Sequence, residues 1–261
     1  MKTKQNEQVC VEKHNLWTLF ERFVLIFLFL PVLTVLIPMQ AWAADDPNDD
    51  TVILDGVSYH VLRNNDDWER FSALVDKSAG DEDVNAIMEA DLSVTSWVGK
   101  NPDWAFRGIF NGNGHTLNVE INNPYNDLYM APFAFTSNAT IRDLHVTGNV
   151  SGGKHSSGLV GFVGRTATGC SLTVERVWVS TTVTANDNSE YTGEFVGGFV
   201  GHARKNSIVL TDCRFDGKLI STCQSTDDDK ERVAGAFVGW GEEGVSYDIR
   251  RVYEKIGRAH V

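Results

Sequence analysis

The sequence predicts an all-β protein that winds as a parallel β-helix (a solenoid) with an N-terminal capping helix. The first observation is a repeat. Apolar or small residues stand at offsets 0, 3, 5, 7 and 9 in units that begin at Ile141, Val174 and Leu210, and a unit at Ile249 keeps the first two positions. The second is that these offsets mainly alternate, which is typical of strands and not of helices. One such unit cannot bury its apolar face alone, so neighbouring units are expected to stack.

A short glycine-rich apolar run precedes three of these units, at residues 157–161, 197–201 and 235–239. Each run predicts a second short strand that begins at a tight bend, because glycine allows close backbone approach. The repeat glycines are Gly158, Gly161, Gly198, Gly201, Gly235 and Gly239. If the units coil in parallel, Val146, Val179 and Phe215 line up as one column. An antiparallel β-sandwich or barrel also has short strands at regular spacing and is the alternative.

Residues 1–43 have the pattern of a secretory signal peptide. Basic residues precede an apolar run from Phe23 to Ile37, and Ala41-Trp42-Ala43 provides a small-x-small cleavage site. The apolar run has 15 residues, fewer than the roughly 20 that a membrane span needs. An uncleaved N-terminal anchor is the alternative, and contact with a membrane is expected only through this segment.

The charge of the chain bears on its partners. The whole chain has a formal net charge of −12, and removal of residues 1–43 leaves −13. An acidic surface argues against nucleic acid and anionic lipid as partners.

The N-terminal part is expected to hold a flexible acidic leader at 44–50 and a cap at 51–105. Within the cap, the segment 52–62 predicts a hairpin or a pair of edge strands around Asp55-Gly56. A helix is predicted over about 66–78, capped by Asn65 or Asp66 and ended by Gly80. Its apolar stripe consists of Trp68, Phe71, Leu74 and Val75. This stripe is expected to cover the open end of the stacked strands.

Further along, residues 84–94 predict one strand, with Val84, Ala86, Met88, Leu92 and Val94 as inward candidates. The run Asn111-Gly112-Asn113-Gly114 predicts a turn with positive φ angles between two apolar strands. Gly112 and Gly114 are therefore counted among the structural glycines. His115 beside the turn is a candidate ligand or acid-base group, although a hydrogen bond that stabilises the turn is the favoured interpretation.

The Phe106–Val119 block and the Gly-x-x-Gly units together resemble bacterial cell-surface proteins with GLUG-type repeats. The resemblance covers about Tyr59 to Tyr253 and implies a right-handed parallel β-helix over 106–253. Modules of this kind occur in large exported proteins, some of them proposed adhesins and some attached to proteases. The resemblance carries over no catalytic residue. The repeats here are longer than the shortest family forms, because of the loops at 184–195 and 221–232.

Cysteine and acidic residues give few signals for a metal site or a cofactor, and none is predicted. Cys213 occupies offset 3 of its repeat unit, so it is expected to be a small buried hydrophobic residue. A disulfide between Cys170 and Cys223 is conceivable in an oxidising compartment. The acidic loops offer weak calcium candidates, although solvated loops are the favoured interpretation. The candidates are Asp187, Glu190, Asp227 and Asp229.

The last residues, 254–261, resemble the translation of a sequencing adapter. This predicts that the reading frame runs off a DNA fragment and that the natural protein is longer.

The favoured function is a non-catalytic module that is secreted or displayed on the cell surface. It would serve as an adhesin or scaffold for host or cell-wall glycan or protein, with its oligomeric state open. Trp178 and Trp240 are candidates for stacking on sugars, with packing between loops as the alternative. Other hypotheses are a carbohydrate-active enzyme such as a polysaccharide lyase, or an accessory region of a secreted protease. The enzyme hypothesis is weakened because the acids of the repeats do not recur at one shared offset. Asp143 and Asp212 stand at offset 2, Glu175 stands at offset 1, and the fourth unit has Arg250 at offset 1.

Overall fold

The computed structural model describes residues 50–78, 82–123, 128–164, 169–186, 194–221 and 232–254. All of them belong to one compact unit that spans Asp49–Val261. Strands account for 57% of the described residues, which confirms the all-β class. In this part of the chain no helix has the length and apolar character needed to span a membrane. The predicted signal peptide, most of the leader and the tail after residue 254 lie outside the described residues.

The chain begins with the hairpin β1 (Thr51–Leu54) and β2 (Val57–Leu62), followed by the helix α2 (Asn65–Lys77). Next come β3 (Ala86–Met88), β4 (Leu92–Val94), the 3-10 turn η1 (Pro102–Trp104), β5 (Phe106–Asn111), β6 (Thr116–Asn122) and the long β7 (Phe133–Gly152). The following strands are β8 (Val160–Val163), β9 (Ser171–Val179), β10 (Thr182–Ala185), β11 (Glu194–Gly197), β12 (Val200–Ala203), β13 (Ser207–Thr211) and β14 (Arg214–Phe215). The last are β15 (Lys218–Ser221), β16 (Arg232–Gly235), β17 (Val238–Gly241), β18 (Ser246–Arg250) and β19 (Tyr253–Glu254).

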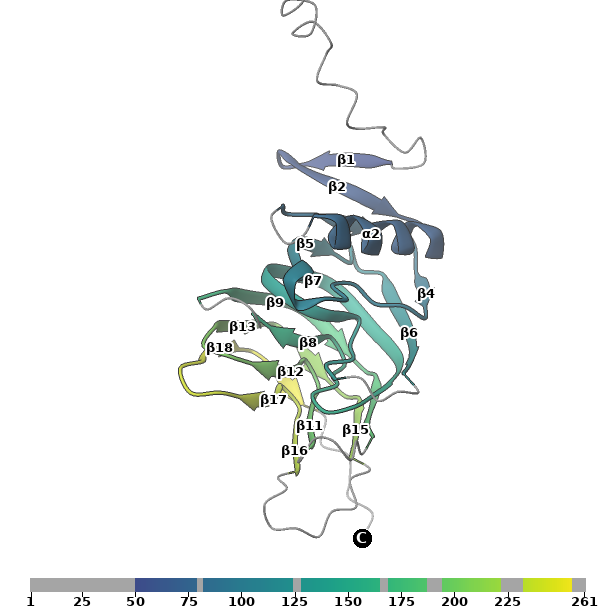
Figure 1. Cartoon of the computed structure of the whole chain (residues 1–261). Helices are drawn as coiled ribbons and strands as arrows, with labels where there is room; N and C mark the ends of the chain where they lie inside the picture. Colours follow the sequence, from purple (N-terminus) through teal and green to yellow (C-terminus); the bar gives the residue numbers. More distant parts are fainter. Residues whose placement is uncertain are drawn as a thin grey trace, which may run out of the picture. The chain divides into compact units, whose positions relative to one another are not determined.

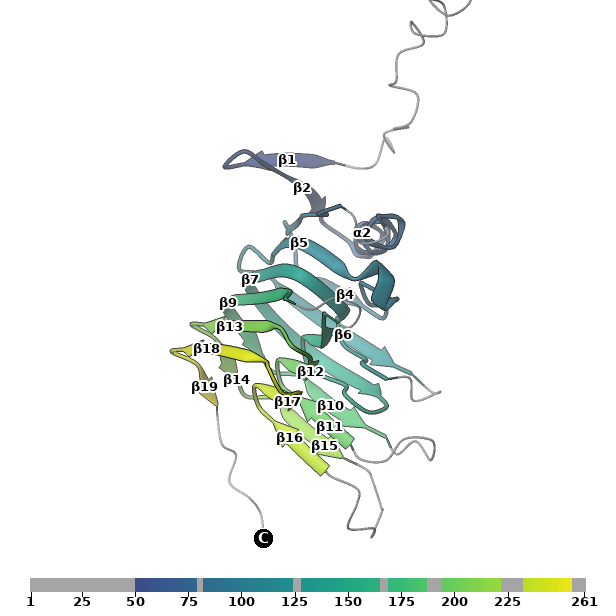
Figure 2. The ribbon, with the colours of Figure 1, turned by 60° about the vertical axis from the view of Figure 1, so that its left-hand side comes forward.

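Parallel pairing dominates the sheet. β1 and β2 pair antiparallel, as the predicted hairpin requires, and the other pairings among the described strands are all parallel. Figures 1 and 2 both show β5, β7, β9, β13 and β18 one below another. The antiparallel sandwich or barrel is therefore wrong, because its strands would have to pair mainly in opposite directions.

Equivalent segments of successive repeats pair with each other. β13 lies between β9 and β18, and β12 lies between β8 and β17. Val146 is in register with Val179, and Val179 is in register with Phe215. Leu117 extends this column by pairing with Val146, and all four side chains are buried. The predicted column is confirmed, and burial explains why offset 5 of the repeat stays apolar.

The predicted helix is present, and it starts with a capping box. Asn64 is the N-cap: its side chain accepts a hydrogen bond from the backbone of Asp67, whose own side chain accepts from the Asn64 backbone. The prediction of Asn65 or Asp66 as cap was wrong by one or two positions. The helix is capped at its other end by Ser78, and Gly80 lies outside the described residues.

The buried face of α2 joins the same core as the repeats. Trp68, Phe71 and Val75 are at most 1% exposed, and Trp68 and Phe71 make edge-on ring contacts with Phe110 and Phe106 respectively. Figure 2 shows the helix end-on beside β2 and β4. The cap and the repeats therefore share one hydrophobic core, and the predicted role of the apolar stripe is confirmed.

The predicted strand at 84–94 is two strands. β3 pairs with β5, and β4 pairs with β6, so the chain turns a corner between Met88 and Leu92. All five inward candidates are nevertheless buried. The alternation of apolar residues continues across the corner, so the sequence pattern gave no sign of a break between two strands.

Close backbone packing explains the repeat glycines. A Cβ atom on Gly161 or Gly201 would overlap the carbonyl oxygen of Tyr129 or His155, and one on Gly239 would stand 2.9 Å from the carbonyl carbon of Val196. Added Cβ atoms would likewise crowd side-chain or backbone atoms at Gly112, Gly158, Gly198 and Gly235. Gly114 differs: it has open space around it but a φ of +81°. The first group is needed for space, and Gly114 for its left-handed conformation.

Candidate functional site

One corner of the repeat carries a ladder of alternating charges. Asp143, Arg176, Asp212 and Arg251 all have left-handed backbone conformations, with φ between 51° and 55°. Each immediately follows a residue of one in-register row, which consists of Arg142, Glu175, Thr211 and Arg250. The corner residues therefore stack from one repeat to the next, and their charges alternate along the stack. We call these four residues the corner ladder.

Ion pairs divide the four residues of the corner ladder into two pairs, Asp143 with Arg176 and Asp212 with Arg251. The guanidinium of Arg176 donates from Nε and Nη2 to the two carboxylate oxygens of Asp143, at 2.5 and 2.8 Å. Arg251 makes the same two-fold contact with Asp212. These hydrogen bonds lower the pKa of both aspartates. Both carboxylates are therefore held as anions that already have partners.

Sequence reasoning missed this ladder. All four residues stand at offset 2 of their units, but the sequence comparison sought a recurring acid and took Glu175 and Arg250, both at offset 1, in place of Arg176 and Arg251. A search for either sign of charge at each offset would have found it.

A second row of outward side chains runs beside the corner ladder. Thr116, His145, Trp178, Arg214 and Tyr253 are in register from one coil to the next. The His145 ring stacks on the Trp178 ring at 3.9 Å between centroids and 10° between planes, and the Arg214 guanidinium lies 4.7 Å from the Trp178 centroid. Because His145 and Arg214 belong to the coils on either side, both faces of the indole are covered.

Trp178 is therefore packed rather than open. Its Nε1 atom donates to Asp216 at 2.6 Å, and the residue as a whole is 38% exposed. The structure favours the packing interpretation over stacking of a sugar on this ring.

A shallow groove of about 430 Å³ lies where the corner ladder meets this second row. Its lining consists of Asn111, Asn113, Gly114, Asp143, Leu144, His145, Arg176 and Trp178. The end of β5 and the turn after it contribute the first three, and β7 and β9 contribute the rest. The groove thus crosses three neighbouring strands, and we call it the corner groove.

The tautomer of His145 follows from its hydrogen bonds. The hydroxyl of Ser180 donates to the carbonyl oxygen of Val146 at 3.3 Å, so its oxygen is free to accept from His145 Nε2 at 2.8 Å. Burial lowers the pKa of His145 below 6.5, which keeps the imidazole neutral at pH 7. On this basis we assign the proton to Nε2, which leaves a lone pair on Nδ1.

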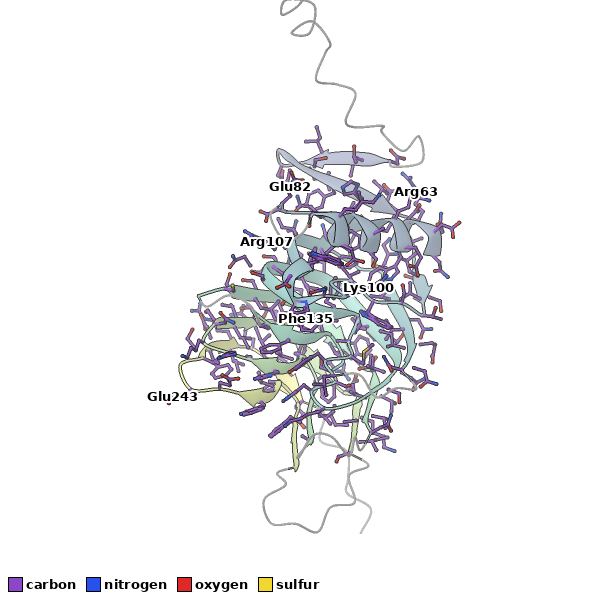
Figure 3. All side chains as sticks on the ribbon, in the orientation of Figure 1. Arg63, Glu82, Lys100, Arg107, Phe135 and Glu243 are labelled. Carbon is purple, nitrogen blue, oxygen red and sulfur yellow. The ribbon has the colours of Figure 1, made fainter. Side chains whose placement is uncertain are left out.

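Another aromatic cluster lies outside the main core. Its rings come from two staggered rows that stack across successive coils. One row is Phe135, Phe162, His202 and Trp240, and the other is Tyr129, His155 and Phe195. Figure 3 labels Phe135, which begins the first row. We call these seven residues the ring cluster.

Trp240 packs within the ring cluster while remaining 37% exposed. Its ring stacks on His202 at 4.8 Å and on Phe195 at 4.6 Å, and Lys154 Nζ lies 5.4 Å from its centroid. As with Trp178, packing accounts for this residue.

The two histidines of the ring cluster are buried and stacked on each other at 4.4 Å. Burial lowers the pKa of His155 to about 2 and that of His202 to about 4, although Glu242, 3.0 Å from His202 Nε2, acts to raise the latter. Both rings are therefore neutral at pH 7.

His115 supports its turn, as the favoured interpretation predicted. Its backbone N–H donates to the Gly112 carbonyl at 2.9 Å, and its ring Nδ1 lies 3.2 Å from Asp91, which also accepts from the backbone of Thr116. Asp91 therefore binds both the ring and the strand that follows the turn.

Cys213 is 1% exposed, so its predicted role as a buried hydrophobic residue is confirmed. Cys170 is also buried, and its sulfur lies 3.2 Å from Ser137 Oγ. Cys223, the candidate disulfide partner of Cys170, lies outside the described residues. The same holds for the calcium candidates Asp187, Glu190, Asp227 and Asp229. Among the residues that are described, no three His, Cys, Asp or Glu side chains gather as a metal site would require.

A comparison of this chain with protein-family models, with curated proteins and with solved structures found no match to any of them.

Proposed function

We propose that the chain is a non-catalytic, exported surface module that binds glycan or protein, with an adhesive or scaffolding role. The finer fold proposed for it is a right-handed parallel β-helix of the GLUG type. In-register parallel pairing of equivalent segments over successive repeats supports this fold. Such coils place outward side chains in straight rows, which suits recognition of an extended partner.

The corner groove is the observation that carries the proposal. It lies open on the surface, crosses three neighbouring strands, and presents amides beside a pair of charges that already neutralise each other. A lining of this kind can recognise a partner by hydrogen bonding. Its one carboxylate, that of Asp143, is already bound by Arg176, so the lining offers no free carboxyl group for proton transfer.

The enzyme alternative is less well supported. A glycosidase needs a general acid whose pKa is raised so that the carboxyl keeps its proton. Asp143 and Asp212 have the opposite environment, since arginine hydrogen bonds lower the pKa of each. An accessory role beside a protease remains compatible with the proposed binding function.

Export is the part of the proposal that residues 1–43 support. Expression of the full chain in a bacterial host, followed by fractionation and mass analysis of the N-terminus, tests it. We expect a product that begins near Ala44 outside the cytoplasm. A full-length product retained in the cytoplasm would contradict it.

Binding is tested by screening the exported full chain against immobilised glycans and cell-wall preparations. The informative variant is Asn111→Ala in the corner groove. Its matched control is Asn122→Ala, an exposed asparagine at the end of β6 that lies outside the groove lining. We expect Asn111→Ala to weaken retention and Asn122→Ala to leave it unchanged. A chain that binds no glycan and no cell-wall protein would refute the binding role.

A further inference from the structure

We propose that the corner groove takes an uncharged, hydroxyl-rich ligand, namely a neutral saccharide. This inference rests on the proposed binding function and names the chemical class that the groove favours. Charge, hydrogen-bonding groups and ring exposure each support it.

The charges in the groove cancel. Both carboxylate oxygens of Asp143 accept from Arg176, and the remaining Nη1 of Arg176 lies 3.5 Å from Glu175. An anionic ligand would have to compete with these carboxylates for the guanidinium, and a cationic ligand would have to displace the guanidinium from Asp143. The net charge of −12 on the chain further disfavours a polyanion.

The groups left available suit hydroxyls. Asn111 uses its side-chain oxygen to accept from the Asn113 backbone at 2.9 Å, which leaves its NH₂ group as a donor. The hydrogen bond to Ser180 leaves Nδ1 of His145 as an acceptor, and no donor among the described residues reaches it. A hydroxyl can accept from the first group and donate to the second, whereas a carboxylate can do only the former.

The apolar contribution is restricted. His145 and Arg214 cover the faces of Trp178, so a ligand reaches only the ring edge. Hydrogen bonds, and not stacking on a sugar face, therefore determine how the ligand lies.

The experiment measures binding of neutral manno- and cello-oligosaccharides, oligogalacturonate and chitosan oligomers to the full chain by calorimetry. Two variants probe the site: Asn111→Ala removes the donor, and His145→Phe keeps a ring on Trp178 while removing the acceptor. Each should weaken binding of the neutral sugar about 3- to 10-fold, the effect of one lost hydrogen bond. Asn122→Ala should leave binding unchanged.

The outcomes separate this inference from the function on which it rests. Neutral sugar binding that both groove variants weaken supports it. Preferential binding of oligogalacturonate or chitosan, weakened by Asn111→Ala, overturns the neutral class and leaves glycan binding at the groove standing. Binding that neither groove variant changes overturns the site. A chain that binds no saccharide overturns this inference together with the glycan part of the proposed function.

Discussion

At the scale of single residues, the stacked His155 and His202 make stability depend on pH. Both pKa values are lowered from 6.5 by burial, to about 2 and about 4. Between pH 6.5 and about 4 the unfolded chain therefore binds protons that the folded chain does not. Stability is fully present above pH 6.5 and falls as the pH decreases, by about 1.4 kcal/mol per pH unit for each histidine.

His202→Phe tests this dependence, because Phe162 already fills the preceding place in the same row. Glu242 keeps a partner in the variant, since Arg204 lies 3.2 Å from it. We expect the variant to reduce the pH slope of the unfolding free energy between pH 6.5 and 4.5 by about 1 kcal/mol per pH unit, measured by urea titration. An unchanged slope in His202→Phe would show that His202 does not contribute.

The corner ladder gives a second test at this scale. Arg176 has a φ of 53°, a conformation that asparagine tolerates and β-branched residues do not. Arg176→Asn and Arg176→Val both remove the ion pair with Asp143, so their difference isolates the backbone. We expect the valine variant to be less stable than the asparagine variant by about 1–2 kcal/mol. Equal unfolding free energies for the two would refute the backbone contribution.

At the scale of elements, two glycines that are needed for different reasons should respond differently to substitution by alanine. A Cβ on Gly201 would overlap the His155 carbonyl, whereas a Cβ on Gly114 meets nothing within 4 Å but has an unfavourable φ. Gly201→Ala should cost about 1–3 kcal/mol or more, as overpacking does, and Gly114→Ala about 1 kcal/mol. Denaturant unfolding measures both. If Gly201→Ala proves the milder change, the close approach of the His155 loop is not a constraint.

The elements that sequence predicted are those whose position is fixed by burial. Val146, Val179 and Phe215 had to be apolar at one offset because each lies in the core, and alternation made that visible. The corner positions do not require one residue type in this way. A left-handed position accepts aspartate in one coil and arginine in the next, so a search for a shared residue type at that offset found nothing.

One row of the ring cluster could not be predicted for a related reason. Tyr129 and His155 lie in turns and Phe195 lies in β11, and unequal intervals separate them along the chain, so no fixed spacing connects them. The corner groove likewise depends on the Asn111–Gly114 turn standing beside two other coils. This row and the corner groove have no periodic signal, because each forms between repeats and not within one. The other row has such a signal, since Phe162, His202 and Trp240 each follow the last glycine of a glycine-rich run.

At the scale of the whole molecule, the two ends of the core differ. At one end α2 covers the apolar interior, and Trp68 and Phe71 are at most 1% exposed. Toward the other end, Ile249 is in register below the fully buried Leu210 but is itself 42% exposed. Tyr247 and Tyr253, on the same pair of strands β18 and β19, are 47% and 66% exposed.

The exposed side chains of β18 and β19 predict self-association of this chain. Apolar side chains that continue a core row lose contact with water when another surface covers them, and exposed strand edges favour such pairing. We expect the average mass of the full chain in sedimentation velocity to rise with concentration, and Ile249→Asn combined with Tyr253→Ser to reduce that rise. Trp104→Ser serves as the control, because Trp104 is also 42% exposed but lies in η1, away from this end. If Trp104→Ser reduced the concentration-dependent rise in mass equally, association would be due to exposed apolar residues in general. A constant monomer mass over the whole concentration range would show that β18 and β19 attract no second copy.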